Sequence, residues 1–360
     1  MTSMMRTIPA AALAVMLAAP AVADAQGPPP RPRPRDDERR GPETTERFSK
    51  TVRLGRGGTF DLANLAGDIF ITGGGGNELR IDAMKRVRSR DEAAATTQLH
   101  AIEIEVVELS NRVEVRTIYP GRLGRNALGA VDFTVMLPQD ANVTVKSVSG
   151  HVRVTNVRGE LRAESVSGDV TAADAPKVSA LKSVSGNVQL TNASAEASVD
   201  LNTVSGDLIV RGLKARTIEI GSVSGDLRLD NIESERVSVK TVSGDMEYGG
   251  MLARNGRYEF MAHSGDILLN LSGNTGFDVE ASTFSGDVRS DYALTLRGTK
   301  GNIAPLPGPR GRRERIGGLG LPGGAGRQNR GVRTLRGSFG DGSASVELQS
   351  FSGNIAIAKR

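Results

Sequence analysis

Apolar and polar residues alternate along most of the chain between residues 48 and 296, and a short turn motif interrupts the alternation at regular intervals. Before a turn come apolar pairs two residues apart, such as Ile218 and Ile220. After it come similar pairs, such as Leu227 and Leu229. A period of two is the spacing of β-strands, and no helical period fits between the turns. The pattern therefore predicts a strand on each side of every turn.

The turn motif is Ser-Gly followed by Asp, Asn or His, and it is repeated at intervals of 18 to 21 residues. Its consecutive copies place glycine at Gly150, Gly168, Gly186, Gly206, Gly225, Gly244, Gly265 and Gly286. A further copy, Ser352-Gly353-Asn354, stands near the end of the chain. Self-similarity at a period near 20 residues is typical of a solenoid.

Strand spacing combined with this repeat predicts an all-β protein, a single-chain parallel β-helix (β-solenoid) of about 18–21 residues per coil. Stacking at ~4.8 Å per coil pairs each strand with its copy one turn away. One coil cannot bury its own apolar row, whereas stacked coils share a continuous aliphatic spine. We expect Val184, Val204 and Val223 to lie close to one another in such a stack.

Each residue type of the turn has a physical reason to recur. Glycine allows a backbone angle or a close approach that a Cβ would forbid. Asp or Asn beside it can accept hydrogen bonds from local backbone N–H groups. The hydroxyl residues three positions before the glycine should stack into a ladder along one edge, at residues Ser147, Ser165, Ser183, Thr203, Ser222 and Thr241.

The same repeat should stack Asp207, Asp226 and Asp245 into an acidic row. Such a row could collect a hard cation such as calcium. Two observations favour turn chemistry instead: the nonapeptide of calcium-binding β-rolls is absent from the sequence, and Asn187 and His151 interrupt the row. We therefore expect no metal site, no cofactor-binding residue and no cofactor.

The regular repeat spans residues 141–296, and different patterns flank it. Residues 48–140 show strand patterns without strict periodicity, and one short helix is predicted between Ser89 and His100, with a serine cap and acids in its first turn. Exposed solenoid ends need an atypical unit to cover them. We expect residues 48–140 to cap the first coil and the C-terminal coil, residues 337–360, to close the other end.

Three further segments have their own composition. Residues 1–25 combine a basic start, a short apolar run and Ala23-Asp24-Ala25, which predicts a secretory signal peptide. Residues 26–47 are rich in Pro and Arg and predict a disordered linker. Residues 297–336 carry ten Lys and Arg against Glu314 alone and predict a disordered basic insertion. This insertion accounts for the net charge of +5.

Composition limits the chemistry that the chain can support. The sequence has no Cys, which removes thiol catalysis, disulfides and Cys-ligated zinc. The three His residues, His100, His151 and His263, supply catalytic triads poorly. His263 is the one irregular polar residue of the repeat, and we interpret it as an ordinary side chain near a turn. No catalytic residue is expected.

Several motifs together resemble a known family. They are Ala66-Gly67-Asp68-Ile69, Leu137-Pro138, the Ser-Val-Ser-Gly-Asp units and Phe351-Ser352-Gly353-Asn354-Ile355. They resemble the "putative adhesin" β-strand-repeat family (domain of unknown function 4097) of bacterial envelope proteins, over residues 48–296 and 337–360. The resemblance implies a β-helical, exported, non-enzymatic protein and supplies no catalytic residues.

Three functions follow from these observations. The first is an adhesin-like or structural interaction module of the envelope, periplasmic or at the cell surface, which binds a polymer, a protein or another copy of itself. The second is a polysaccharide-acting enzyme, since β-helices host lyases and hydrolases. The third is an envelope-stress sensor that binds an anionic surface through the basic insertion. We favour the first, because the acids repeat at turns instead of clustering. The sequence contains no specific nucleic-acid motif and predicts no transmembrane segment in the mature chain.

Overall fold

The structure is a computed structural model that describes residues 42–89, 91–119, 128–296 and 332–360. The predicted signal peptide lies outside the described residues, as do most of the linker and most of the basic insertion. Strand β1 (Glu43–Arg53) already begins inside the expected linker, and β21 (Arg333–Phe339) begins inside the expected insertion. Both edges of these segments are therefore ordered strand, because they pair with neighbouring strands.

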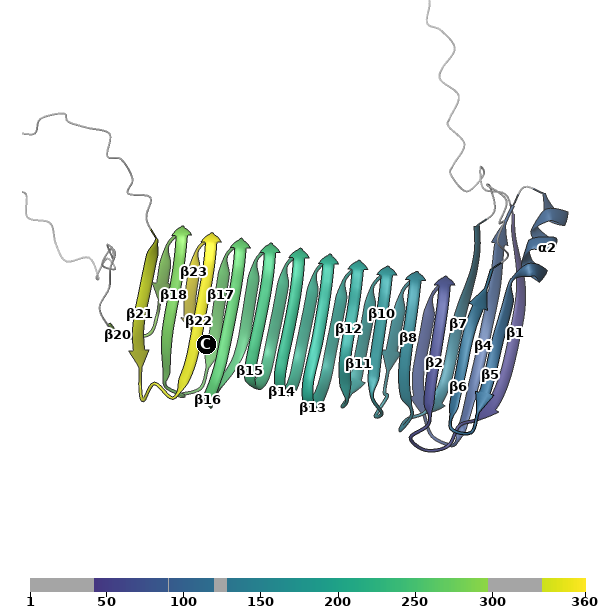
Figure 1. Cartoon of the computed structure of the whole chain (residues 1–360), viewed down its shortest axis with the longest axis horizontal. Helices are drawn as coiled ribbons and strands as arrows, with labels where there is room; N and C mark the ends of the chain where they lie inside the picture. The colour runs from purple at the N-terminus through teal and green to yellow at the C-terminus, as the bar shows by residue number, and fades with distance from the viewer. Residues whose placement is uncertain (1–41, 90, 120–127, 297–331) are drawn as a thin grey trace, which may run out of the picture. The chain divides into compact units, whose positions relative to one another are not determined.

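The chain forms an all-β, solenoid-like stack of coils, and the strands of each coil lie beside those of the next (Figure 1). The first strands and the helix after β1 are β2 (Thr59–Ala66), β3 (Ile69–Gly74), β4 (Glu78–Arg88), α2 (Glu92–Ala101), β5 (Glu103–Leu109), β6 (Arg112–Ile118) and β7 (Leu128–Pro138). The regular part comprises β8 (Asn142–Ser149), β9 (Val152–Thr155), β10 (Leu161–Ser167), β11 (Val170–Ala175), β12 (Val178–Ser185), β13 (Val188–Ser205), β14 (Leu208–Ser224), β15 (Leu227–Ser243) and β16 (Met246–Ser264). The last strands besides β21 are β17 (Ile267–Ser272), β18 (Phe277–Ser285), β19 (Val288–Ser290), β20 (Thr295–Leu296), β22 (Ala344–Ser352) and β23 (Ile355–Lys359).

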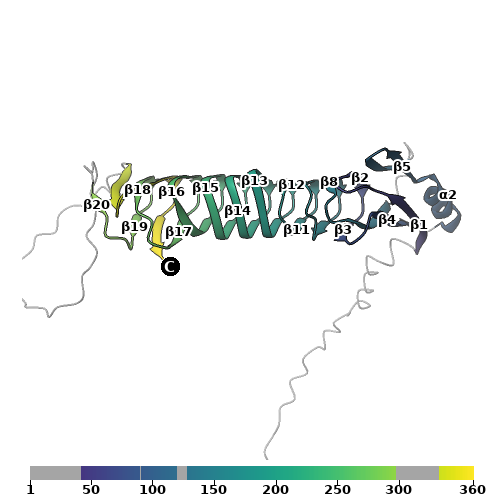
Figure 2. The same ribbon diagram turned by 90° about the horizontal axis from the view of Figure 1, so that it is seen from below.

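Two ladders of parallel strands run along the stack, and they form the two layers that Figure 2 shows. The strand segments before each turn glycine pair in the order β6, β2, β8, β10, β12, β13, β14, β15, β16, β22, β18. The segments after each glycine pair in the order β7, β3, β9, β11, β13, β14, β15, β16, β17, β23, β19. Each of β13 to β16 is long enough to serve both ladders.

The core lies between the two layers and is built from the alternating apolar positions. Leu201, Ile220 and Val239 follow one another in register, and each is at most 4% exposed. Aromatic rings fill the core near the C-terminal coils, where Tyr248 packs edge-on against Tyr258 and Phe260. Continuous burial along the stack agrees with the expected aliphatic spine.

The predicted helix is present, and its cap differs from the expected one. The Asp91 side chain accepts hydrogen bonds from the backbone N–H groups of Ala93 and Ala94, at 3.0 and 3.2 Å. Ser89 instead accepts a bond from the Asp91 backbone N–H. The helix packs against β1 and β4, next to antiparallel pairs of β4 with β1 and β7. No helix of the described residues has the length and apolarity needed to cross a membrane.

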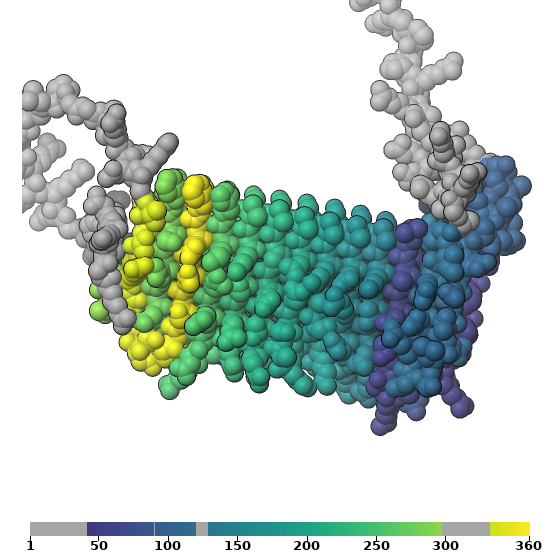
Figure 3. Space-filling model, viewed as in Figure 1, coloured from purple at the N-terminus to yellow at the C-terminus, as the bar shows by residue number. Residues whose placement is uncertain are grey.

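The C-terminal segment does not close the stack, contrary to the sequence-based expectation. Strand β22 pairs on one side with β16 and on the other with β18, so the last residues of the chain form an inner coil. Figure 3 shows this coil as a yellow band between green ones. The edge of β18 is covered by β21, which runs antiparallel to it and pairs with β20. The antiparallel strand satisfies the backbone N–H and C=O groups along the edge of β18, so the last parallel coil does not end in an open strand edge.

Candidate functional site: an apolar groove along the stack

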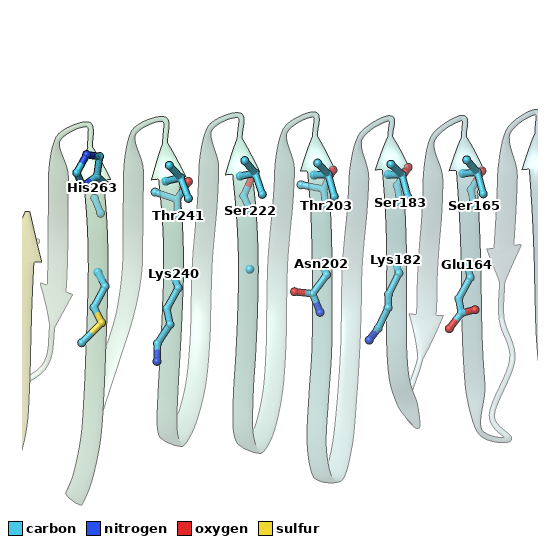
Figure 4. A pocket seen from close by; sticks show the side chains of 18 of the residues that line it. Glu164, Ser165, Lys182, Ser183, Asn202, Thr203, Ser222, Lys240, Thr241 and His263 are labelled. Carbon is cyan, nitrogen blue, oxygen red and sulfur yellow. The ribbon is translucent and has the colours of Figure 1, made fainter.

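A groove runs along the outer face of the first ladder and encloses about 1490 Å³. It is lined by the three residue positions that precede each Ser-Gly turn, on strands from β6 to β18. Because side chains alternate across a strand, the middle position points into the core and the two others point outward. Figure 4 shows the rows that these positions form on successive strands.

The outer row nearest the turns is almost entirely apolar, and we call it the outer apolar row. In spatial order its members are Leu65, Val148, Val166, Val184, Val204, Val223, Val242, His263, Phe351 and Phe284. Its aliphatic members are 43–49% exposed. Val184, Val204 and Val223 are adjacent, as expected, but they lie outside the core. The reason is their position one residue after the inward Ser or Thr.

The C-terminal end of this row is aromatic. The His263 and Phe351 rings stack at 5.1 Å with planes 6° apart, and Phe351 stacks on Phe284 at 5.0 Å and 2°. Phe351 therefore lies between two parallel rings, which leave neither of its faces open for a sugar ring to stack on. His263 therefore continues the row as a flat ring.

The second outward row is mostly polar, and we call it the lateral row. In spatial order it contains Arg116, Ala63, Lys146, Glu164, Lys182, Asn202, Gly221, Lys240, Met261, Gln349 and Ser282. Several charges are paired within the chain: Glu164 with Arg162 at 2.6 Å, Lys182 with Asp200, and Lys240 with Glu259 at 3.6 Å. The apolar surface is thus one side chain wide and bordered by charges.

The hydroxyl residues form a ladder, but it faces the core and not an edge. Ser183 and Thr203 are 4% and 2% exposed and donate to the carbonyl oxygens of Gly168 and Gly186, at 3.0 and 3.1 Å. The hydroxyls of Ser147, Ser165 and Ser222 are buried without a partner among the described residues. These side chains fill the small space behind the turns.

The acidic row holds neighbouring coils together. The Oδ1 atom of Asp207 accepts the backbone N–H of Asp226 at 3.0 Å, and Asp226 accepts that of Asp245 at 3.1 Å. The same contact recurs with Asn187 as acceptor. The predicted turn chemistry is therefore correct in kind, but each bond reaches the next coil instead of a local N–H. The described residues include no group of three or more His, Cys or acidic residues that could hold a metal ion.

The other two histidines lie apart from the groove. His151 occupies a place in the row of Asp residues, where its Nδ1 lies 3.4 Å from the backbone nitrogen of Asp169. His100 lies in the last turn of helix α2, with its Nε2 3.9 Å from a Glu46 carboxylate oxygen. The three histidines do not come together.

The glycine of each turn is required by a close approach. A Cβ on Gly206, where φ is +151°, would lie 2.3 Å from the carbonyl oxygen of Gly186. The equivalent contact recurs from coil to coil. Close stacking of the turns sets the spacing of the outer apolar row.

Sequence reasoning missed the exposure of the outer apolar row, although the signal was present. The residue two positions before each turn glycine has the opposite parity to the buried pairs, which places it outward. Parity counted from Ile218 and Ile220 would have placed Val223 on the surface.

Comparisons with known proteins give a family match and several similar solved structures. The model of the Toastrack DUF4097 family matches residues 68–303. Among solved structures, a "putative adhesin" from Parabacteroides distasonis is 13% identical, with 63% of this chain and 90% of that chain covered and a TM-score of 0.42. Another from Bacteroides fragilis is 12% identical over 87% and 97%, with a TM-score of 0.41. A "putative lipid binding protein" from Parabacteroides distasonis is 9% identical over 62% and 89%, with a TM-score of 0.28. No curated protein matches.

Proposed function

The chain belongs to the Toastrack DUF4097 family, and from that premise we propose that it is an exported, non-enzymatic interaction module of the cell envelope, which binds through its groove. The observation that carries the proposal is the outer apolar row. Nine of its ten members are apolar and each is 39–51% exposed. Such a surface is costly in water unless something covers it.

The size of the row supports a binding role. The exposed fractions of its apolar members correspond to roughly 700 Å² of surface, and patches on monomeric proteins seldom exceed about 600 Å². Larger exposed patches with polar rims mark interaction sites. The lateral row provides such a rim on one side, and the serines of the turns provide it on the other.

The core does not need the outer apolar row to be apolar, which supports a role for the row in binding and not in folding. Val204 follows Thr203 outward, whereas Val199 and Leu201 on the same strand are fully buried. A polar residue at position 204 would satisfy the fold equally well. Its recurrence as Val, Leu or Phe therefore needs a reason outside the core.

The experiment is cosedimentation of the purified chain with envelope fractions, compared with a variant that carries Val184→Lys, Val204→Lys and Val223→Lys. We expect the variant to lose most of the bound fraction while keeping the β-sheet circular dichroism spectrum. Gln189→Lys, on β13 but in the other layer, is the matched control. Equal binding by all three proteins would refute the proposal.

A further inference from the structure

We propose that the occupant of the groove is a second copy of this chain, packed groove to groove around a two-fold axis that passes through β13. This inference deepens the proposed function and depends on it, because it names the partner of the same surface. Its basis is the repeat of the outer apolar row and the order of charges in the lateral row.

The repeat of the row favours a partner with the same repeat. Successive members are set by strand pairing at ~4.8 Å, a spacing that side chains of another β-stack also have. Two sheets can then pack face to face with side chains meeting coil by coil. The strands of this face keep nearly one direction along the stack in Figure 1, which suits such packing.

The exposed area of this face is also large enough for a dimer interface. A standard interface buries about 800 Å² on each partner, and the outer apolar row with the adjoining lateral row supplies about that amount. A single extended chain lying on the row would cover only its centre. A second stack covers the row and both of its borders.

Charges select one arrangement of the two copies. A two-fold axis parallel to the strands keeps each row opposite its own copy and reverses the order of coils. The groove is lined by eleven strands from β6 to β18, and β13 is the central one. With the axis at β13, every strand that lines the groove faces a strand of the other copy.

This register places opposite charges against each other. Glu164 lies two strands before β13 and Lys240 two strands after it, so each meets the other across the interface, twice by symmetry. Lys182 faces Gly221, the one residue of the row without a side chain, and Asn202 faces itself. Figure 4 shows Glu164, Lys182 and Lys240 in the same row. Moving the axis by half a coil brings Lys240 opposite Lys146 or Lys182 instead.

The outer apolar row is matched in the same register. Val204 meets Val204, Val184 meets Val223, and Val166 meets Val242. Leu65 at one end meets the aromatic end at Phe351. Val148 meets His263, and in the lateral row Lys146 meets Met261.

The test is sedimentation-velocity analysis of the full chain between 1 and 50 µM, whose monomer mass is 37.9 kDa. We expect the wild-type chain to form a dimer. Val204→Lys should raise the dissociation constant by about 100-fold, because it places two ammonium groups against each other in an apolar contact. Gln189→Lys should leave it unchanged.

Charge reversal tests the register. Glu164→Lys alone and Lys240→Glu alone should each raise the dissociation constant by about tenfold, since each creates two like-charge pairs. The double variant restores both pairs and should return to within about threefold of wild type. Arg153→Glu, outside the groove, is the matched control, and melting curves show that each variant is folded.

The outcomes separate this inference from the proposed function. A wild-type chain that stays monomeric at 50 µM overturns the pairing, and so does a double variant that is no better than the singles. If such a monomer still binds envelope fractions through Val184, Val204 and Val223, the proposed function stands with a different partner. If neither dimerisation nor envelope binding responds to these residues, both proposals fail.

Discussion

Strand β14 carries both buried and exposed apolar residues within six positions. Ile218 and Ile220 are at most 4% exposed and pack against Val199 and Leu201 of the preceding coil, whereas Val223 is 47% exposed. All three recur with the coil repeat and all are β-branched. They differ only in the side of the strand on which they lie: Ile218 and Ile220 face the core, and Val223 faces outward. The inner row holds the coils together, and the outer row presents a surface, so recurrence in a repeat does not by itself identify a core residue.

The strongest way to sharpen this comparison is to place the same charge on both faces of β14. Ile220→Asp buries a carboxylate between Leu201 and Val239 and disrupts the contacts with both neighbouring coils. We expect a loss above about 4 kcal/mol in the free energy of unfolding, enough to prevent folding. Val223→Asp should change it by less than about 0.5 kcal/mol. Urea unfolding followed by circular dichroism measures both, and similar losses would contradict the assignment of the two faces.

The coil of β13 and β14 has two corners, the Ser-Gly turn at Gly206 and a second bend six residues later at Gly212, and they offer the next contrast. Gly206→Ala puts a Cβ 2.3 Å from a backbone oxygen of the previous coil, and the stacked turns leave it no room. We expect a loss of about 3 kcal/mol. Gly212, six residues later, has φ +68°, and its neighbours Asn192 and Asn231 adopt the same conformation. Gly212→Asn should therefore be nearly neutral in thermal unfolding. A small loss in the free energy of unfolding for Gly206→Ala would contradict this and would show that the stacked turns can move apart.

The second corner helps to show which features of the fold the sequence predicts and which it does not. The Ser-Gly turns, the strand period and the stacking followed from local repeats. The corner six residues after the turn glycine is also visible, at Asn156, Asp174, Asn192, Gly212 and Asn231. Strands β13, β14 and β15 continue through it, and their buried positions shift there by one residue. The position of β22 between β16 and β18 depends on pairing between segments about 85 residues apart, which no local pattern encodes. The exposure of the outer apolar row follows from parity within a single strand, because Val223 has the opposite parity to Ile218 and Ile220 before the turn begins.

The acidic row should contribute less than the glycines, because its bonds lie at the surface. Asp226→Ala removes the acceptor for the Asp245 N–H, and water can replace it, so we expect a loss of about 1 kcal/mol or less. Asp226→Asn should be neutral, since Asn187 makes the same contact in the wild-type chain. Combining Asp207→Asn with Asp226→Asn also tests the enzymatic alternative. Polysaccharide turnover that this folded double variant abolishes would overturn the interaction-module proposal.

The last contrast is between two serines that share the inward hydroxyl row and differ in one hydrogen bond. The Ser183 hydroxyl donates to the Gly168 carbonyl oxygen at 3.0 Å, so Ser183→Ala leaves that part-buried acceptor with one bond fewer and should cost about 1 kcal/mol. The Ser165 hydroxyl is equally buried and has no partner among the described residues, so Ser165→Ala removes an unsatisfied group and should be neutral or slightly stabilising. Neither side chain points outward, so neither variant should alter binding to envelope fractions. Equal losses for both serines in urea unfolding would mean that packing behind the turns, and not the hydrogen bond, determines their contribution.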